Sequence, residues 1–358
     1  MKSIIISVLK FILKVYPEKY REYYQILVVY YVNKLSPSKK KEFYAEIERR
    51  SHLSLFNVDE LSAELSSYSE EYYYVNSRFA IAHALRKYAN WNKPINAVIE
   101  HGVYYDDDLK DMEVYNNRFP GLMTFGPVRY NFLNKLIGHE KEIVKLGPHI
   151  AYVDSLLSDD ELKTLKKELG SVFLAIPTHS IESHKLEFDY EGLIADIKEK
   201  GANYDTILVN VYYMDVIFGR HQVYLDAGFK VVTSGHRSDL NFLPRLKSII
   251  SLADMTMTNR FSTPIGYCLH LNKPHYIYNQ ELTWKPTEKA LDFHADTKVD
   301  KMEDKLAKYN KVFSNFSTKI TPDQMEVYNN IWGGNESVKS KEELYSIFEK
   351  FSKKSIWK

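Results

Sequence analysis

The chain has 358 residues, and its 48 Lys and Arg nearly balance its 47 Asp and Glu, for a net charge of +1. This balance argues against a protein that binds nucleic acid through its overall charge. The length predicts about two domains. The single cysteine, Cys268, excludes an intramolecular disulfide and fits a reducing compartment, so we expect a cytoplasmic protein.

Residues 1–15 carry apolar side chains at helical spacing, with Lys10 and Lys14 on the other face, which predicts an amphipathic helix. The stretch is too short and too charged to span a bilayer, and no A-x-A-like cleavage site follows it. We expect the helix to pack on the protein core. The alternative is peripheral contact with the inner face of the cytoplasmic membrane.

The first half of the chain reads as helices followed by short strands. Apolar spacing predicts helices at 39–50 and 77–88, and Ser158 is a suitable N-cap for a charged helix that ends near Gly170. Strands are predicted at 95–100, 122–125 and 142–146, each followed by a turn that contains glycine. This alternation favours a parallel sheet.

After Gly170 the pattern is more regular. Apolar strands are expected at 171–176, 205–212, 229–233, 255–259 and 275–278. Helices are expected between them at 190–200, 220–227, 242–252 and 263–271. Strand and helix alternating at this spacing are typical of a doubly wound α/β fold.

Ligands of open parallel sheets bind beyond the carboxyl ends of the strands. The predicted strand ends carry a concentration of polar groups able to do chemistry. They are Glu100-His101-Gly102 with Asp106-Asp107-Asp108, then His179-Ser180, then Ser234-Gly235-His236-Arg237, and then Arg260 with Ser262-Thr263 and Gly266.

Ser262 and Thr263 open a predicted helix, whose free N–H groups and partial positive charge suit a phosphate. Arg260 can add a bidentate contact, and Arg237 can neutralise a leaving phosphate. His236 can act as acid or base near neutral pH, and Glu100 or His101 is a base candidate on the other half. The alternatives are an ordinary helix cap and a surface turn.

Several other chemistries find no support in the sequence. The three aspartates at 106–108 read as a solvated loop rather than a metal site, so we expect no bound metal and no cofactor. Zinc-binding and P-loop spacings are absent, as are the G-x-S-x-G and G-x-G-x-x-G motifs.

Two sets of motifs stand out, one in each half of the chain. In the second half, within 231–278, they are Ser234-Gly235-His236-Arg237, 242–250, 259–266 and Asn272-Lys273-Pro274. In the first half they are Val98 to Tyr104 and 143–152. Together these motifs resemble bacterial capsule and lipopolysaccharide glycosyltransferases of the GT-B architecture, and the resemblance covers roughly residues 70–335.

The resemblance implies an α/β fold of two Rossmann-like domains that face each other across a cleft, after a helical N-terminal region. The implied divisions are an acceptor-side domain at 1–155, a nucleotide-sugar-binding domain at 156–335 and a final helix at 336–358 that crosses back to the first domain. Tyr104, Asp106 and Asp107 would lie on the acceptor side.

The implied activity is metal-independent transfer of a sugar from a nucleotide-sugar to a glycan or lipid-linked acceptor in surface polysaccharide synthesis. Ser262 and Thr263 also look like the phosphate site of CMP-sugar transferases, but this chain lacks their His-Pro dipeptide. CMP-, UDP- and GDP-linked donors therefore stay open. Transfer of a phospho-polyol or pyruvyl group and non-catalytic binding of a sugar nucleotide are the alternatives.

Overall fold

The structure is a computed structural model that describes residues 36–66, 68–104, 119–288 and 299–354. The predicted amphipathic helix at 1–15 lies outside the described residues. Within the described ranges, no helix has both the length and the apolar character needed to cross a membrane.

The first half contains a parallel sheet of three strands, β1 (Val98–Ile99), β2 (Gly121–Thr124) and β3 (Glu142–Lys145), in the order β1-β2-β3. Leu122 lies opposite Val98 on one side and Ile143 on the other. Helix α5 (Ile81–Tyr88) precedes the sheet, and α6 (Pro127–Ile137) connects β2 to β3. The three predicted strands of this half are confirmed, although β1 is shorter than expected.

The second half contains a parallel sheet of five strands, with the order β7-β6-β4-β8-β9. The strands are β4 (Val172–Ala175), β6 (Thr206–Asn210), β7 (Lys230–Val232), β8 (Met255–Thr258) and β9 (His275–Ile277). Counted along the chain this is the order 3-2-1-4-5 of a mononucleotide-binding α/β unit. The direction of strand addition reverses between β4 and β8, so a crevice is expected at their carboxyl ends.

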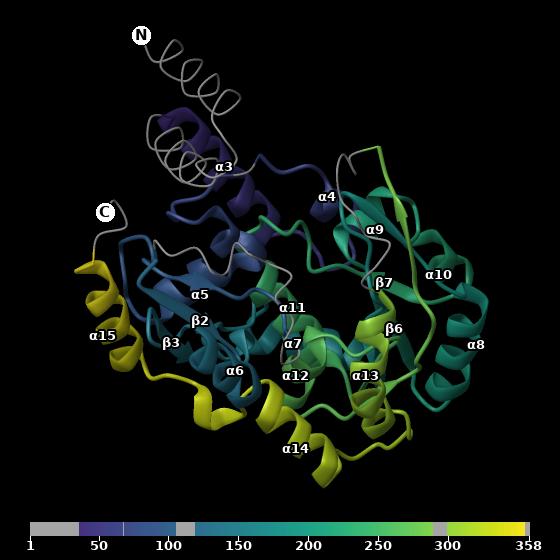
Figure 1. Ribbon diagram of the computed structural model, residues 1–358. Helices are drawn as coiled ribbons and strands as arrows, with labels where there is room; N and C mark the ends of the chain where they lie inside the picture. Colours follow the sequence, from purple (N-terminus) through teal and green to yellow (C-terminus); the bar gives the residue numbers. More distant parts are fainter. Residues whose placement is uncertain (1–35, 67, 105–118, 289–298, 355–358) are drawn as a thin grey trace.

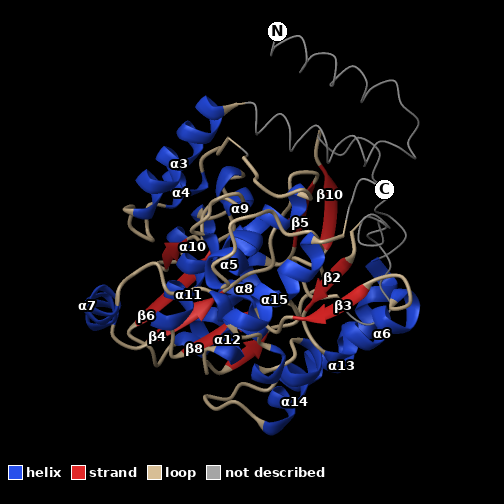
Figure 2. Ribbon diagram, turned by 90° about the vertical axis from the view of Figure 1, so that its left-hand side faces the viewer, coloured by secondary structure: helices blue, strands red, loops and turns tan. Residues whose placement is uncertain are grey.

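The helices that accompany this sheet largely match the predicted pattern. They are α7 (Asp159–Leu169), α8 (Tyr190–Gly201), α9 (Tyr213–Ile217), α10 (Gln222–Asp226), α11 (Phe242–Leu252) and α12 (Thr263–His270). Ser158 caps α7 in a reciprocal capping box with Glu161, as the sequence predicts. Figure 2 shows the strands of this sheet with helices around them.

Two features differ from the sequence prediction. An antiparallel pair, β5 (His184–Glu187) with β10 (Thr283–Pro286), forms from segments without alternating apolar residues, because its partners come together only in the fold. The predicted helix at 77–88 starts at Ile81 instead. Before it lies a 3-10 segment, η1 (Tyr74–Ala80), that is interrupted by non-helical backbone at Arg78 and Phe79.

The second sheet is followed, at the C-terminal end of the fold, by the helices α13 (Val299–Phe313), α14 (Pro322–Ile331) and α15 (Lys341–Ser352). Helix α15 lies beside β2 and β3 (Figure 1), where a Cβ on Gly121 would overlap the Phe351 ring. Asn96 donates from Nδ2 to the Phe351 carbonyl at 2.9 Å. The last helix therefore packs on the first sheet.

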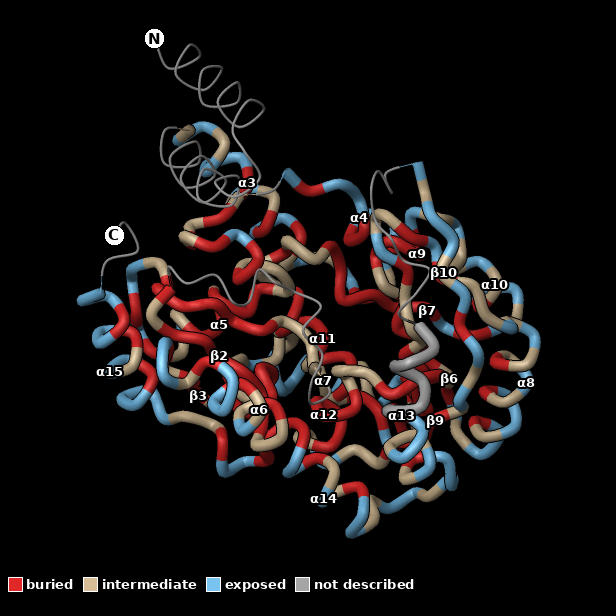
Figure 3. Tube along the Cα trace, in the orientation of Figure 1, coloured by how far each residue is buried: buried red, intermediate tan, exposed pale blue. Residues whose placement is uncertain are grey.

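Buried residues follow the strands and the helices packed on them (Figure 3). One apolar cluster includes Met123 of β2, Leu174 of β4 and Leu208 of β6, so the two sheets share a core. The division at residues 155 and 335 therefore stays a prediction.

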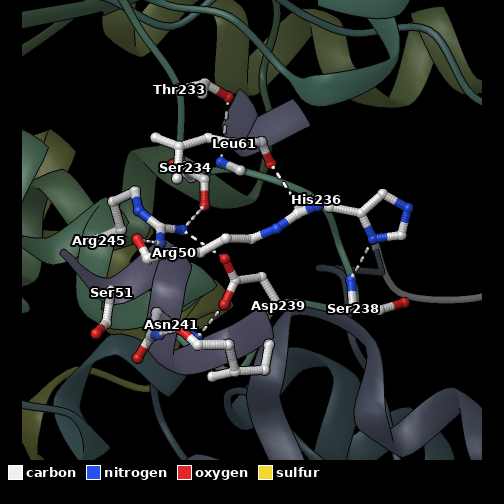
Figure 4. A network of polar contacts seen from close by, with 12 residues as sticks. Arg50, Ser51, Leu61, Thr233, Ser234, His236, Ser238, Asp239, Asn241 and Arg245 are labelled. Atoms are coloured by element: carbon white, nitrogen blue, oxygen red, sulfur yellow. Dashed lines mark hydrogen bonds and ion pairs between the residues drawn. The ribbon is translucent and has the colours of Figure 1, made fainter. Parts of the chain in front are cut away.

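The N-terminal helices α3 (Pro37–Ser51) and α4 (Val58–Ser62) pack on the loop after β7 (Figure 4). The carbonyl of Leu61 accepts from the His236 N–H at 3.0 Å, and that of Arg50 accepts from the Arg245 guanidinium at 3.2 Å. Arg245 also forms a fully buried ion pair with Asp239 at 3.0 Å. This network holds residues 234–239 in place.

Candidate functional site

A cavity of about 330 Å³ lies at the carboxyl ends of both parallel sheets. Its wall includes residues that follow β1, β4, β6 and β7, together with the first residues of α12. Among them are His101, Gly102, Thr178, His179, Asn210, Tyr212, Ser234, Gly235, Arg237, Ser262 and Thr263. Apolar side chains, including Phe79, Val211, Phe242, Leu243 and Leu246, form much of the remainder. The cavity thus combines an apolar floor with polar strand-end groups, as small-molecule sites commonly do.

The structure places seven of the predicted site residues on this one cavity. These are His101, His179, Ser234, Gly235, Arg237, Ser262 and Thr263. They come together because parallel strands deliver their following loops to one edge of a sheet. Their positions are now known, and their chemical roles stay predictions.

The N-terminus of α12 meets the loop after β1. Thr263 accepts from the Val103 N–H at 3.1 Å through Oγ1, and Gly102 lies beside the same hydroxyl. Ser262 is the N-cap residue, and its side chain makes no capping hydrogen bond. Pro264 has no N–H, and the Ile265 N–H donates to the Ser262 carbonyl at 3.2 Å. The Ser262 hydroxyl and the Thr263 N–H are therefore the groups at this helix end that suit an anion in the cavity.

His179 has a defined tautomer. Its Nδ1 lies 3.0 Å from the Ser180 carbonyl, which can only accept, so Nδ1 carries the proton and Nε2 keeps its lone pair. The ring packs on Tyr212 with centroids 3.9 Å apart. Burial lowers the pKa of His179, which favours the neutral imidazole. His179 thus has the chemical state of a proton acceptor.

Arg237 reaches the cavity with a carboxylate partner. Its guanidinium lies 2.7 Å from Oε1 of Glu182, which also accepts from the Tyr213 hydroxyl at 3.2 Å. The Arg237 side chain is 26 % exposed, so this ion pair is in contact with water. Such a pair can rearrange around an anionic ligand at little cost to stability.

Two predicted catalytic residues have other environments. Glu100 is buried and does not line the cavity. Its carboxylate accepts from Thr124 Oγ1 at 2.5 Å and pairs with Arg129 at 2.7 Å. His236 also lies outside the cavity wall, and its ring packs on Tyr213. Its Nδ1 accepts from the Ser238 N–H at 3.1 Å (Figure 4).

Burial and the nearby Arg237 lower the pKa of His236 to about 4. Of the three predicted catalytic residues, Glu100 and His236 are thus engaged in holding the loops that carry His101 and Arg237, whereas His101 lines the cavity. We assign neither Glu100 nor His236 a catalytic role.

Three predicted phosphate-binding residues also lie off the cavity wall. Gly266 faces Trp332, whose ring an added Cβ would overlap, so its small size serves helix packing. Ser180 is buried and donates from Oγ to Asp215 Oδ1 at 2.6 Å. Arg260 is buried as well. Strand-end position alone did not show which of these residues face the cavity.

On the predicted acceptor side, the Arg129 guanidinium lies 4.8 Å from the centre of the Tyr104 ring. Tyr104 is not part of the cavity wall. Asp106 and Asp107 lie outside the described residues.

The sequence reading missed Arg78 and Phe79, which line the cavity from η1. Phe79 and Ala80 have φ values of 57° and 63°, the left-handed region that bulky residues rarely adopt. Each such residue costs on the order of 1–3 kcal/mol. Their apolar spacing predicts an unbroken helix, so no sequence signal marks the turn.

The chain matches no protein-family model and no curated protein sequence. Among solved structures it is similar to the wall teichoic acid polymerase TagF, with a TM-score of 0.39 and 15% identity over 72% of this chain and 67% of that one. The N-terminal domain of Candida albicans trehalose-6-phosphate phosphatase has a TM-score of 0.29 and 9% identity over 66% and 58%. At these low scores, neither likeness carries a functional conclusion.

Proposed function

We propose that the protein is a glycosyltransferase that moves a sugar from a nucleotide-sugar donor to a hydroxyl acceptor. The observation that supports this best is the cavity at the carboxyl ends of both sheets, next to the reversal of strand order between β4 and β8. Nucleotides bind at this point of α/β sheets. The cavity also has histidine, arginine and a helix N-terminus in its wall.

In the proposed reaction, the acceptor oxygen forms a bond to the anomeric carbon of the donor sugar. The bond between that carbon and the phosphate oxygen breaks, and its electron pair leaves with the nucleotide. Arg237 and the N-terminus of α12 would stabilise the negative charge that develops on the phosphate. Because these groups supply the positive charge, we expect activity without a divalent metal, which a chelator tests directly.

The proton of the acceptor hydroxyl must pass to a base. His179 is our first candidate because its Nδ1 donates to the Ser180 carbonyl and its Nε2 keeps a lone pair. His101, on the loop after β1, is the second candidate within the same cavity. The acceptor is expected to be a glycan or a lipid-linked hydroxyl compound.

The test begins with calorimetric titration of the protein with CMP, CDP, UDP and GDP, followed by incubation of the matching sugar nucleotide with glycan acceptors. A product heavier by one sugar residue supports the proposal. An added phospho-polyol or pyruvyl mass would assign a different transferase activity.

Variants then assign the base. His179→Ala is expected to lower kcat by about 10²–10⁴-fold, the usual contribution of general base catalysis. If His179→Ala keeps its activity and His101→Ala loses it, the base is His101. A wild-type protein that binds none of the four nucleotides would refute the proposed function.

A further inference from the structure

The turn at Arg78–Ala80 is the most unusual backbone that borders the cavity. Phe79 and Ala80 are consecutive residues with positive φ, and neither is glycine. Glycine would adopt this conformation without the steric conflict of a Cβ. Strained backbone of this kind persists where the surrounding structure holds it, and it clusters at ligand-binding sites.

A backbone hydrogen bond joins the strained turn to the loop that carries Arg237. The Phe79 N–H donates to the Arg237 carbonyl at 2.7 Å. The Phe79 ring then meets three rings of the cavity wall. It stacks with His101 at a centroid distance of 6.0 Å and lies 5.0 Å from Phe242 and 6.3 Å from Tyr212. Phe79 is only half-buried, unlike the fully packed core residues Ile81 and Leu85 of α5.

The same turn presents a positive charge to the cavity. Within the part of the chain that the structure describes, the Arg78 guanidinium has no carboxylate partner, and it lies 5.9 Å from the centre of the Tyr74 ring. Arg237, in contrast, is paired with Glu182. Among the described residues, Arg78 is therefore the arginine on the cavity wall that an incoming anion can bind without displacing a carboxylate.

We propose that Arg78 and Phe79 form a ligand-contacting element, in which the Phe79 ring packs on the nucleoside of the donor and Arg78 binds its phosphate. An aromatic ring next to a guanidinium matches a ligand that joins a ring to an anion. This inference rests on the proposed function and adds two binding residues to it.

A purely structural role predicts different behaviour. If Phe79 is a packing residue, its replacement lowers the melting temperature and leaves ligand affinity unchanged. If the turn is held for binding, Phe79→Gly removes strain together with the ring. The melting temperature then changes little, and affinity falls.

The experiment measures nucleotide affinity by calorimetry for the wild-type protein, Phe79→Gly, Phe79→Leu and Arg78→Gln. The probe is whichever of CMP, CDP, UDP and GDP the wild type binds, with pyrophosphate as the ring-free comparison. Both Phe79 variants are expected to lose about tenfold in nucleotide affinity. They should keep pyrophosphate affinity within about twofold, since that ligand has no ring to pack.

Arg78→Gln is expected to weaken nucleotide and pyrophosphate alike by about tenfold, because it removes a charge rather than a ring. Ala80→Gly is the matched control, because it relaxes the neighbouring strained residue and leaves both contacting side chains in place. It should bind as the wild type does.

If the wild type binds a nucleotide and both Phe79 variants bind it equally well, the role of Phe79 is refuted while the proposed function stands. Unchanged affinities in Arg78→Gln likewise refute the role of Arg78. A wild type that binds none of the four nucleotides overturns the proposed function and this inference together.

Discussion

At the scale of single residues, the partners of each arginine separate supporting from ligand-facing roles. Arg245 and Arg129 are buried, and each pairs with a buried carboxylate, Asp239 and Glu100 respectively. Removing either would leave a buried charge without its partner, which is strongly destabilising. Arg237 and Arg78 instead reach the cavity, so their loss should affect ligands more than folding.

Arg237→Ala tests this distinction. We expect kcat to fall by about 10²–10³-fold, because a donor to the developing phosphate charge is removed. The free energy of unfolding should change by less than about 1 kcal/mol, since the ion pair with Glu182 is partly exposed. Steady-state kinetics and urea denaturation measure the two quantities.

Arg49→Ala is the control, because it removes another water-exposed arginine that pairs with Glu46 and Glu60. It should change neither quantity appreciably. Full activity in Arg237→Ala would show that Arg237 does not bind the leaving phosphate.

At the scale of elements, α12 joins the cavity to the C-terminal helices. Its N-cap Ser262 and its first residue Thr263 line the cavity, and Gly266 one turn later packs against Trp332 after α14. Trp332 is itself fully buried and contacts Phe261 with ring centroids 5.3 Å apart. The position of the helix N-terminus thus depends on a close helix contact that only glycine permits.

Gly266→Ala should therefore destabilise the protein. The added methyl group would overlap the Trp332 ring, and overpacking of this kind typically costs about 1–3 kcal/mol. Guanidinium denaturation followed by circular dichroism measures the change.

The control is Gly102→Ala, whose Cβ would meet Thr263 Oγ1 at 3.8 Å and no other atom of the described residues within 4 Å. It should unfold at nearly the wild-type denaturant concentration. Equal stability of Gly266→Ala and the wild type would mean that α12 and Trp332 are not packed as described.

At the scale of the whole molecule, buried histidines couple stability to pH. Burial lowers the pKa of His149 and His275 to about 3, and that of His83 and His236 to about 4. The unfolded chain binds these protons near the ordinary histidine pKa of about 6.5. Glu71 acts in the opposite direction, because burial raises its pKa to about 7.

We expect stability to fall as the pH drops from about 6.5 to about 4. In this window the four histidines bind protons in the unfolded state but stay neutral in the folded state, which favours unfolding. The opposing group Glu71 is outnumbered by these four histidines. The melting temperature should decrease steadily across the window, as measured by scanning calorimetry.

His149→Phe should reduce this slope, because it removes one of the histidines whose pKa burial lowers. The buried imidazole of His149 has no hydrogen-bond partner among the described residues, so an apolar ring can replace it without leaving a partner unpaired. His52→Gln is the control, since His52 is exposed on the surface. A melting temperature that does not change over this range would contradict the buried, neutral state of these histidines.

The sequence by itself determined the strands of the two parallel sheets, most of the helices and the side of the sheet where polar residues gather. Local patterns carry this information, because apolar periodicity and glycine turns act over a few residues. The strands ending near Ile99, Ala175, Val232 and Thr258 were therefore predictable, as was the gathering of His101, His179, Arg237 and Thr263.

The tertiary structure alone decided which strand-end residues face the cavity. Glu100 and His236 follow strands as His101 and Arg237 do, but Arg129 and Tyr213 come from distant segments to engage them. The left-handed turn at Phe79 likewise exists because the carbonyl of Arg237 holds it from across the chain. Contacts between residues far apart in sequence leave no periodic pattern, and so only the folded chain shows them.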